Sequence, residues 1–348
     1  MAQQGLNHQL PSYMVAREFG EVNVRPIGDQ IEVSFTILME PDGEMAEGWQ
    51  TGVALDASAS MKSWFGRGLS GEVPKDVLEA YRQRGWLKEQ QIDGRRVQSL
   101  RSLAFQDAIR SGFVKPTPNI VEPWARQFIS YLADNLDEDG GTTVIYWACD
   151  DGRGYEVVGD FTASQVRSLS LTGPKDHDWG RGTHLLPAMK YFVDRFRDAR
   201  RGMYLFLTDG HIDDMDAVQS YTARLCSEIA SGRRNMVKCV LIGVGDRIDH
   251  RQLEALDDFD SGTDVDIWDH KIAREMRGVV EIFAEVVNHN QIVAPTARIL
   301  DETGHVVRLF ADGLPAHVRF KMKRRSAFFD LEIGEHRIRQ YLAPPRSS

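Results

Sequence analysis

The pattern of apolar and polar positions divides the chain into stretches of different period. Residues 21–26 and 30–40 alternate between apolar and polar side chains, which predicts two strands joined by a turn. From residue 123 to residue 288, short apolar runs alternate with segments of helical spacing, which predicts a mostly parallel sheet covered by helices. After residue 295, short alternating segments follow one another without a helix between them, which predicts an antiparallel unit.

These periods predict four parts of the chain. They are a loose tail, the first strands of a β-sandwich, a doubly wound α/β domain of Rossmann-like type, and a C-terminal β unit, at residues 1–17, 18–49, 50–290 and 291–348. Because the ends of a domain usually lie close together, we expect the two β parts to form one small antiparallel unit. Late in the α/β domain, the spacing predicts a strand at residues 264–268 and a helix at 271–288.

An insertion at about residues 62–118 interrupts the α/β pattern. It is rich in Arg, Gln and Gly, and it has helical spacing at residues 76–90 and 97–109. We expect this insertion to pack near the loop from which it departs. Its aromatic side chains are expected to form a small core of their own, and they include Trp64, Phe65 and Trp86.

The composition is that of an ordinary globular protein, with 42% hydrophobic and 27% charged residues. Lys and Arg number 42 against 51 Asp and Glu, and the resulting net charge of −9 argues against a nucleic-acid-binding surface. No apolar run reaches the ~18 residues that span a bilayer, and the first residues lack the pattern of a signal peptide. A cytoplasmic protein is therefore expected. The 3 cysteines show no CxxC spacing, so neither a disulfide framework nor a zinc site is implied.

The candidate chemistry begins where the apolar run at residues 53–55 ends. Asp56 follows this run, and two hydroxyl side chains, Ser58 and Ser60, stand at alternate positions after it. A buried strand that ends here would present three oxygen ligands at its tip, and oxygen ligands suit hard divalent cations such as Mg²⁺. Since only one of the three groups is acidic, a cation held here would keep positive charge and could share its coordination with another molecule.

Two further segments carry polar side chains at junctions between predicted strands and helices. Thr183 follows a glycine-rich loop at residues 179–182, and Asp209 follows the apolar strand predicted at residues 203–207. Because ligands of parallel sheets bind beyond the carboxyl ends of the strands, Asp56 and Asp209 can share one edge. Each residue alone also has an ordinary structural reading, as a helix cap or a turn residue.

The combination of these segments resembles a known family. The order Asp-Ala-Ser-Ala-Ser at residues 56–60, Gly-Thr at 182–183 and Thr-Asp-Gly at 208–210 is similar to the von Willebrand factor A (vWA) domain. In that family the metal-ion-dependent adhesion site, or MIDAS, is spread over three such loops. The resemblance covers about residues 50–290, and it departs from the family where Ala59 replaces the usual glycine.

The resemblance implies a role for each candidate residue. Ser58 and Ser60 would bind the metal directly, and Thr183 would bind it directly or through water. Asp56 and Asp209 would act mostly through waters and hydrogen bonds. The implied cofactor is Mg²⁺, with Mn²⁺ and Ca²⁺ as alternatives.

The implied function is a non-enzymatic protein–protein interaction, in which an acidic side chain of a partner completes the coordination of the metal. Within the family, the intracellular bacterial branch resembles this chain better than secreted adhesins do, because the chain lacks a signal-peptide pattern and paired cysteines. That branch includes tellurium-resistance-type and other stress-response proteins, and proteins that work beside AAA+ ATPases. A stress-complex component or an AAA+ ATPase is therefore the expected partner, with no nucleic acid and no membrane span.

The alternative is a phosphohydrolase of the haloacid-dehalogenase type, which also places an aspartate at the tip of its first strand. Such an enzyme would use Asp56 as its nucleophile and a second acid two positions later as acid and base. Ser58 stands at that second position and cannot do this work. Asp213 and Asp214 imitate the later acidic pair of such enzymes, but they do not supply the missing group.

Overall fold

The central element of the computed structural model is a mixed sheet of six strands in the order β10-β9-β4-β11-β12-β13. Residues 8–38, 47–92, 95–246, 248–285 and 292–342 are described. The strands span Gly154–Phe161, Thr142–Cys149, Trp49–Asp56, Arg201–Thr208, Met236–Gly243 and Trp268–Ile272, in that order. Neighbouring strands are parallel except for β10, which runs antiparallel to β9 at one edge.

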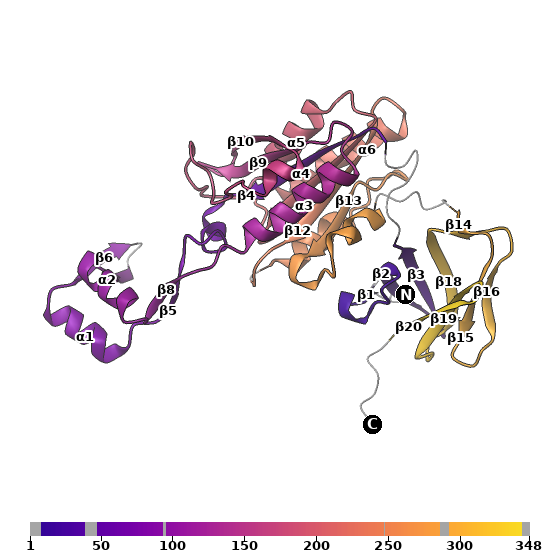
Figure 1. Cartoon of the computed structure of the whole chain (residues 1–348), viewed down its shortest axis with the longest axis horizontal. Coiled ribbons are helices and arrows are strands. Elements are labelled where there is room, and N and C mark those ends of the chain that lie inside the picture. Colours follow the sequence, from indigo (N-terminus) through magenta and orange to yellow (C-terminus); the bar gives the residue numbers. More distant parts are fainter. Residues whose placement is uncertain (1–7, 39–46, 93–94, 247, 286–291, 343–348) are drawn as a thin grey trace.

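The central strands are apolar on both faces because helices cover both faces. On one face, Val53 and Leu55 of β4 pack with α3 (Val121–Asn135) in one apolar cluster. On the other face, Ala54 and Phe206 pack in a second cluster with α5 (Leu185–Arg195), α6 (Met215–Ala230) and α7 (His250–Asp257). The short helix α4 (Ala163–Val166) follows β10. The predicted mixed α/β fold with a mostly parallel sheet is thus confirmed, and Figure 1 shows this arrangement.

Strands from both ends of the chain form two antiparallel sheets. The first, in the order β1-β2-β3-β18, contains His8–Gln9, Phe19–Ile27, Gln30–Ile37 and His317–Lys323. The second, in the order β16-β15-β19-β20, contains Val306–Phe310, Ala297–Asp301, Phe328–Ile333 and His336–Tyr341. Two short strands, β14 (Ile292–Ala294) and β17 (Leu314–Pro315), pair beside them.

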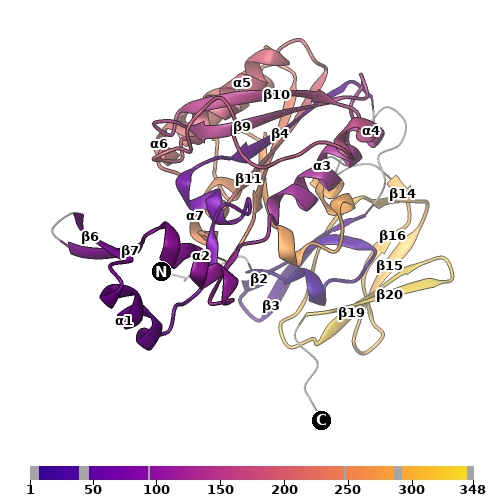
Figure 2. The same cartoon turned by 60° about the vertical axis from the view of Figure 1, so that its left-hand side comes forward.

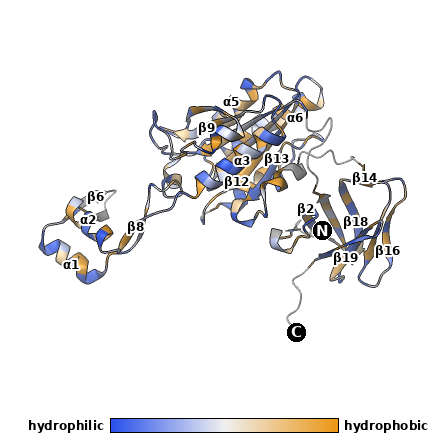
Figure 3. Cartoon of the chain, in the orientation of Figure 1, coloured by the Kyte–Doolittle hydropathy of each residue, from blue (hydrophilic) through white to orange (hydrophobic). Residues whose placement is uncertain are grey.

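A shared apolar core joins these two sheets. Phe19 and Phe35 of the first sheet stack with each other at 4.3 Å between ring centroids, and Phe35 stacks on Phe329 of the second sheet at 5.4 Å. Hydrophilic and hydrophobic residues alternate along β18, and its apolar positions are the buried ones (Figure 3). This alternation is what one-sided burial of an antiparallel sheet requires.

The insertion leaves the end of β4 through a short 3₁₀ helix, η3 (Ala59–Ser63), and forms a small separate body. A two-stranded stalk, β5 (Leu69–Gly71) with β8 (Val114–Pro116), carries it. Beyond the stalk lie α1 (Lys75–Gln83), the hairpin β6 (Leu87–Ile92) and β7 (Arg95–Leu100), and α2 (Ser102–Arg110). Figures 1 and 2 show these elements standing away from the six-stranded sheet.

Several sequence-based expectations for the insertion are wrong. Only its root packs near the Asp56 loop. Trp86 belongs to its own core with Tyr81, but Phe65 lies in the main core and Trp64 packs against it. The helix expected at residues 76–90 ends early because Gly85, at φ +69°, stops it. The helix expected at residues 97–109 begins late, since the hairpin strand β7 uses its first residues.

The last part of the α/β domain also differs from expectation. Hydrogen bonds of the Ser261 and Thr263 hydroxyls hold residues 261–265 in a loop, so β13 begins only at Trp268. In place of a helix at 271–288, two 3₁₀ segments follow, η4 (Ala273–Glu275) and η5 (Val279–Glu285), and residues 286–288 lie outside the described ranges. Another 3₁₀ turn, η1 (Ser12–Met14), lies in the region predicted as a tail.

Arg277, between the two 3₁₀ segments, connects the α/β domain to the chain before β2. Its guanidinium donates to the backbone oxygens of Val15 and Ala16 at 3.0 and 2.8 Å, and to the oxygen of Phe19. It also pairs with Glu281, which is only 2% exposed, at 2.7 Å. Removing this arginine would leave a buried carboxylate without its charge partner.

Candidate functional site

The site lies where β4 and β11 end side by side. The register of the two parallel strands pairs Leu55 with Leu207, so the next residues, Asp56 and Thr208, are neighbours. Asp56 is fully buried, and both of its carboxylate oxygens accept hydrogen bonds at 2.7 Å. Oδ1 accepts from the backbone N–H of Ser58, and Oδ2 accepts from the Thr208 hydroxyl. The carboxylate therefore fixes the loop that follows it to the neighbouring strand.

The two serines of this loop present their hydroxyls together. Ser58 precedes η3 at the position of a helix cap, but its side chain makes no capping hydrogen bond. Its Oγ instead lies 3.0 Å from the Oγ of Ser60. Ser58 is buried and Ser60 is exposed, so the pair leads from the interior to the surface. The structural reading of Ser58 as a capping residue is thus excluded.

The glycine-rich loop is joined to the serine loop by two backbone hydrogen bonds. The Gly180 N–H donates to the Ala57 oxygen at 2.9 Å, and the Ala59 N–H donates to the Gly180 oxygen at 2.9 Å. Any side chain at position 180 would collide with the protein, because a Cβ there would lie 1.8 Å from the backbone oxygen of Ala148. Glycine is therefore required for this contact, which brings Thr183 to the same edge of the sheet.

Thr183 is buried and lies just before α5, but it does not cap that helix. Its backbone N–H donates to Asp213 Oδ2 at 2.7 Å. The first N–H groups of α5 are bound instead by Asp214, which accepts from Leu185 and Leu186 at 2.8 and 3.1 Å. The sequence interpretation treated these two acids only as an imitation of an enzyme motif. Their position just after the Thr-Asp-Gly segment was the signal that they join two loops of one site.

Asp209 follows β11 directly and is 6% exposed. Within the described ranges, its Oδ1 is a buried oxygen without a hydrogen-bond partner. A buried polar atom normally has a partner, so this carboxylate oxygen at the edge of the sheet is open to a further hydrogen-bond donor or to a cation. Gly210, at φ +88°, turns the chain away immediately afterwards.

The electrostatics of the site point to the same conclusion. Burial, together with the neighbouring negative charge of Asp209, raises the pKa of Asp56 from 3.8 to about 7. Within the described part of the chain, no lysine or arginine forms an ion pair with either aspartate. The polar side chains at this edge of the sheet are two carboxylates and the hydroxyls of Ser58, Ser60 and Thr183, which is the donor chemistry that Mg²⁺ prefers. The residues present therefore fit a hard divalent cation.

The end of β9 and the loop that follows it are strained beside the site. Ala148 and Asp150 have positive φ values of 56° and 57°, which is unusual for residues other than glycine. The Asp150 carboxylate accepts from the backbone N–H of Asp178 at 3.0 Å and lies 2.7 Å from Nδ1 of His177. These contacts hold the start of the glycine-rich loop. Strain of this kind is typically found at functional sites.

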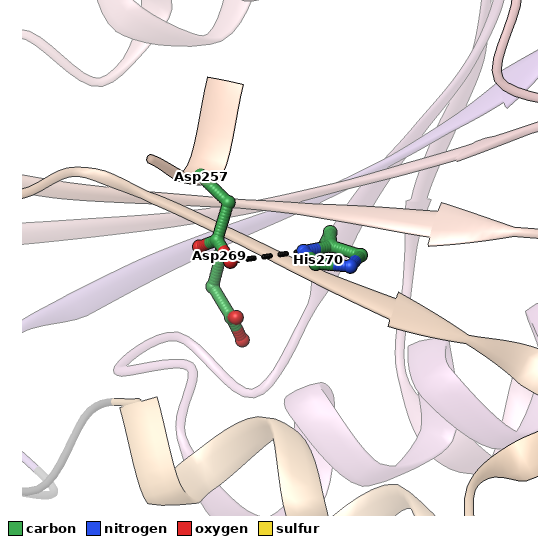
Figure 4. A group of neighbouring side chains, drawn as sticks. All are labelled: Asp257, Asp269 and His270. Carbon is green, nitrogen blue, oxygen red and sulfur yellow. Dashed lines mark hydrogen bonds and ion pairs between the residues drawn. The ribbon is translucent and has the colours of Figure 1, made fainter. Parts of the chain in front are cut away.

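A second group of possible metal ligands lies at β13, the outermost strand on one side of the sheet. Figure 4 shows Asp257 at the end of α7 and the neighbours Asp269 and His270 on β13. His270 Nδ1 lies 2.9 Å from Asp257 Oδ2. Asp269 is already paired, because Lys271 Nζ lies 2.8 Å from its Oδ2 and also pairs with Glu21 of β2. Lys271 thus already occupies this carboxylate and shares its charge between Asp269 and Glu21, so the group is an ion-pair cluster in which Asp269 is buried.

No known protein-family model matches the chain, and no curated protein matches it. Of the helices that the structure describes, none is long and apolar enough to cross a membrane.

Proposed function

We propose that the chain is an interaction module of the von Willebrand factor A type, with a doubly wound domain and a MIDAS-like site that holds a divalent cation, Mg²⁺. The observation that carries this proposal is the orphaned, buried Oδ1 of Asp209 beside the buried carboxylate of Asp56. The hydroxyls of Ser58, Ser60 and Thr183 would hold the cation. Asp56 and Asp209 would hold it mainly through waters.

The bound cation would supply a Lewis-acidic position for a carboxylate from a protein partner. Because Asp56 and Asp209 would hold the ion mainly through waters, a coordination position would stay open to the partner's carboxylate, and Coulomb attraction in a partly dry site exceeds that in bulk water. Ser60 is exposed, and the helices of the insertion stand away from the sheet, which favours access by a partner (Figure 2). The partner class that fits is a cytoplasmic stress-complex component or an AAA+ ATPase with an acidic contact residue.

The geometry favours a binding role over the haloacid-dehalogenase alternative. A nucleophilic aspartate needs an accessible oxygen aimed at a phosphorus atom. Asp56 is fully buried and both oxygens already accept hydrogen bonds, from Ser58 and Thr208. Ser58 also cannot replace the acid–base carboxylate that such an enzyme requires.

Isothermal titration with Mg²⁺ and with Mn²⁺ tests the proposal. The wild type is expected to bind one ion, and the double variant Ser58→Ala/Ser60→Ala is expected to lose at least tenfold in affinity. Ser220→Ala is the matched control, because that hydroxyl is exposed and bonds only the Asp216 oxygen of its own helix. Equal affinities for the wild type and the double variant would exclude the metal site. Turnover of a phosphatase substrate that is lost in Asp56→Asn would establish the enzyme instead.

A further inference from the structure

Two helices that begin at the Asp56 edge also form a separate pocket farther along their length. The pocket has a volume of about 370 Å³ and is lined by side chains of both α5 and α6. Its lining residues come from the second half of α5, from Arg197 just beyond it, from α6, and from Arg234 after α6. None of the residues proposed to hold the cation lines it.

Two cationic side chains, one from α5 and one from α6, lie against one aromatic ring in this pocket, and a third cation is fixed beside them. Lys190 Nζ lies 5.6 Å from the ring centroid of Tyr221, and Arg224 Cζ lies 5.0 Å from the same centroid. The guanidinium of Arg234 is held in place by donating to the backbone oxygen of Val193. Contacts of a cation with an aromatic ring position the charges of Lys190 and Arg224 without neutralising them.

The carboxylates in the pocket do not balance these cations. Asp194 and Glu228 also line it, each one helical turn from Lys190 and Arg224 respectively. Among the described residues neither carboxylate forms an ion pair, although that spacing permits one on a helix. With Arg197 and Arg234 included, four cationic side chains face two carboxylates. Two net positive charges thus collect in a chain whose total charge is −9.

We propose that this pocket binds a small anion with at least two negative charges, of the phosphate-ester or pyrophosphate class. One guanidinium group can bind two phosphate oxygens through two parallel hydrogen bonds. Arg224 and Arg234 reach the pocket from different segments of the chain. The volume lies within the range of about 300–1,000 Å³ that small-molecule sites occupy. A bound dianion would neutralise the excess charge. The inference does not depend on the proposed metal function.

The test is isothermal titration of the whole chain with inorganic pyrophosphate at constant ionic strength, with EDTA present so that the cation site cannot contribute. Wild type is expected to bind one pyrophosphate. Arg224→Gln and Lys190→Gln are each expected to weaken binding at least tenfold. Arg233→Gln is the matched control, because this exposed arginine bonds Ser231 and does not line the pocket.

Three outcomes would overturn the proposal. They are no heat of binding with pyrophosphate up to millimolar concentration, equal affinity in Arg224→Gln, and an equal loss of affinity in Arg233→Gln. Sedimentation with phosphatidylinositol-phosphate vesicles then identifies the source of the phosphate. Sedimentation that Arg224→Gln abolishes supports a lipid headgroup, and pyrophosphate binding without sedimentation supports a free phosphate compound. Loss of Mg²⁺ binding in Ser58→Ala/Ser60→Ala does not affect this test.

Discussion

The Asp56 site is expected to lower the stability of the protein when no cation is bound. The perturbation that shows this is Asp56→Asn, which removes a buried negative charge and keeps the shape of the side chain. Burial and the charge of Asp209 raise the pKa of Asp56 from 3.8 to about 7, so folding favours the protonated form. The stability that this carboxyl contributes is therefore present below about pH 4 and is lost as the pH rises through about 7.

The size of the effect follows from the shift in pKa. The rise of the Asp56 pKa from 3.8 to about 7 corresponds to about 4 kcal/mol between the two protonation states. The variant keeps the acceptor for the Ser58 N–H, but its amide cannot accept from the Thr208 hydroxyl as a carboxylate does. The loss of this hydrogen bond offsets about 2 kcal/mol of the stability gained by removing the buried charge. Asp56→Asn is thus expected to raise the free energy of unfolding by about 2 kcal/mol at pH 8, and by nothing at pH 5.

Urea unfolding at pH 5 and pH 8, in EDTA and in Mg²⁺, measures these differences. In Mg²⁺ at 100 times the dissociation constant, wild type should gain about 2.7 kcal/mol, which the variant should not gain. Asp198→Asn is the control, because this aspartate is exposed and lies outside the Asp56 site. The reasoning is refuted if Asp56→Asn is less stable than wild type at pH 8 in EDTA.

Three further predictions follow from other contacts. Gly180→Ala should weaken Mg²⁺ binding at least tenfold and lower the free energy of unfolding by about 2 kcal/mol, as measured by titration and urea unfolding. Gly141→Ala should change neither quantity, because a Cβ at position 141 would meet no atom within 4 Å. Arg277→Ala should lower the free energy of unfolding by about 3 kcal/mol, because it leaves Glu281 buried without its partner. Limited proteolysis should then cleave the chain before β2 faster than in wild type, and an unchanged cleavage rate would contradict this. Replacing residues 69–116 with a short Gly-Ser linker should leave the urea midpoint and Mg²⁺ affinity unchanged, because that segment has its own core; aggregation would show that the main core needs it.

Much of the α/β fold could be predicted from local pattern. Strands buried on both faces, such as those ending at Asp56 and Thr208, are continuous apolar runs, and amphipathic helices show in their spacing. The edge where parallel strands end could be inferred without coordinates. Oxygen-bearing side chains at these ends therefore marked the candidate site. Local pattern was less reliable in short segments whose sequence is compatible with both helix and strand, as in the insertion and after residue 260.

Tertiary contacts decided what local pattern could not. The insertion's aromatic residues look alike in sequence, but Phe65 contacts Tyr146 and Trp179 of the main domain, at 6.0 and 5.3 Å between ring centroids, while Trp86 packs in the insertion. The roles of Asp213 and Asp214 arise only when two loops meet.

The orphaned oxygen of Asp209 and the convergence of cations on Tyr221 also depend on segments distant in the chain. Periodicity reports which face of an element is buried, because burial repeats with the element's own geometry. It carries no information about which distant side chain lies opposite. The charge balance of both proposed sites was therefore visible only in the folded chain.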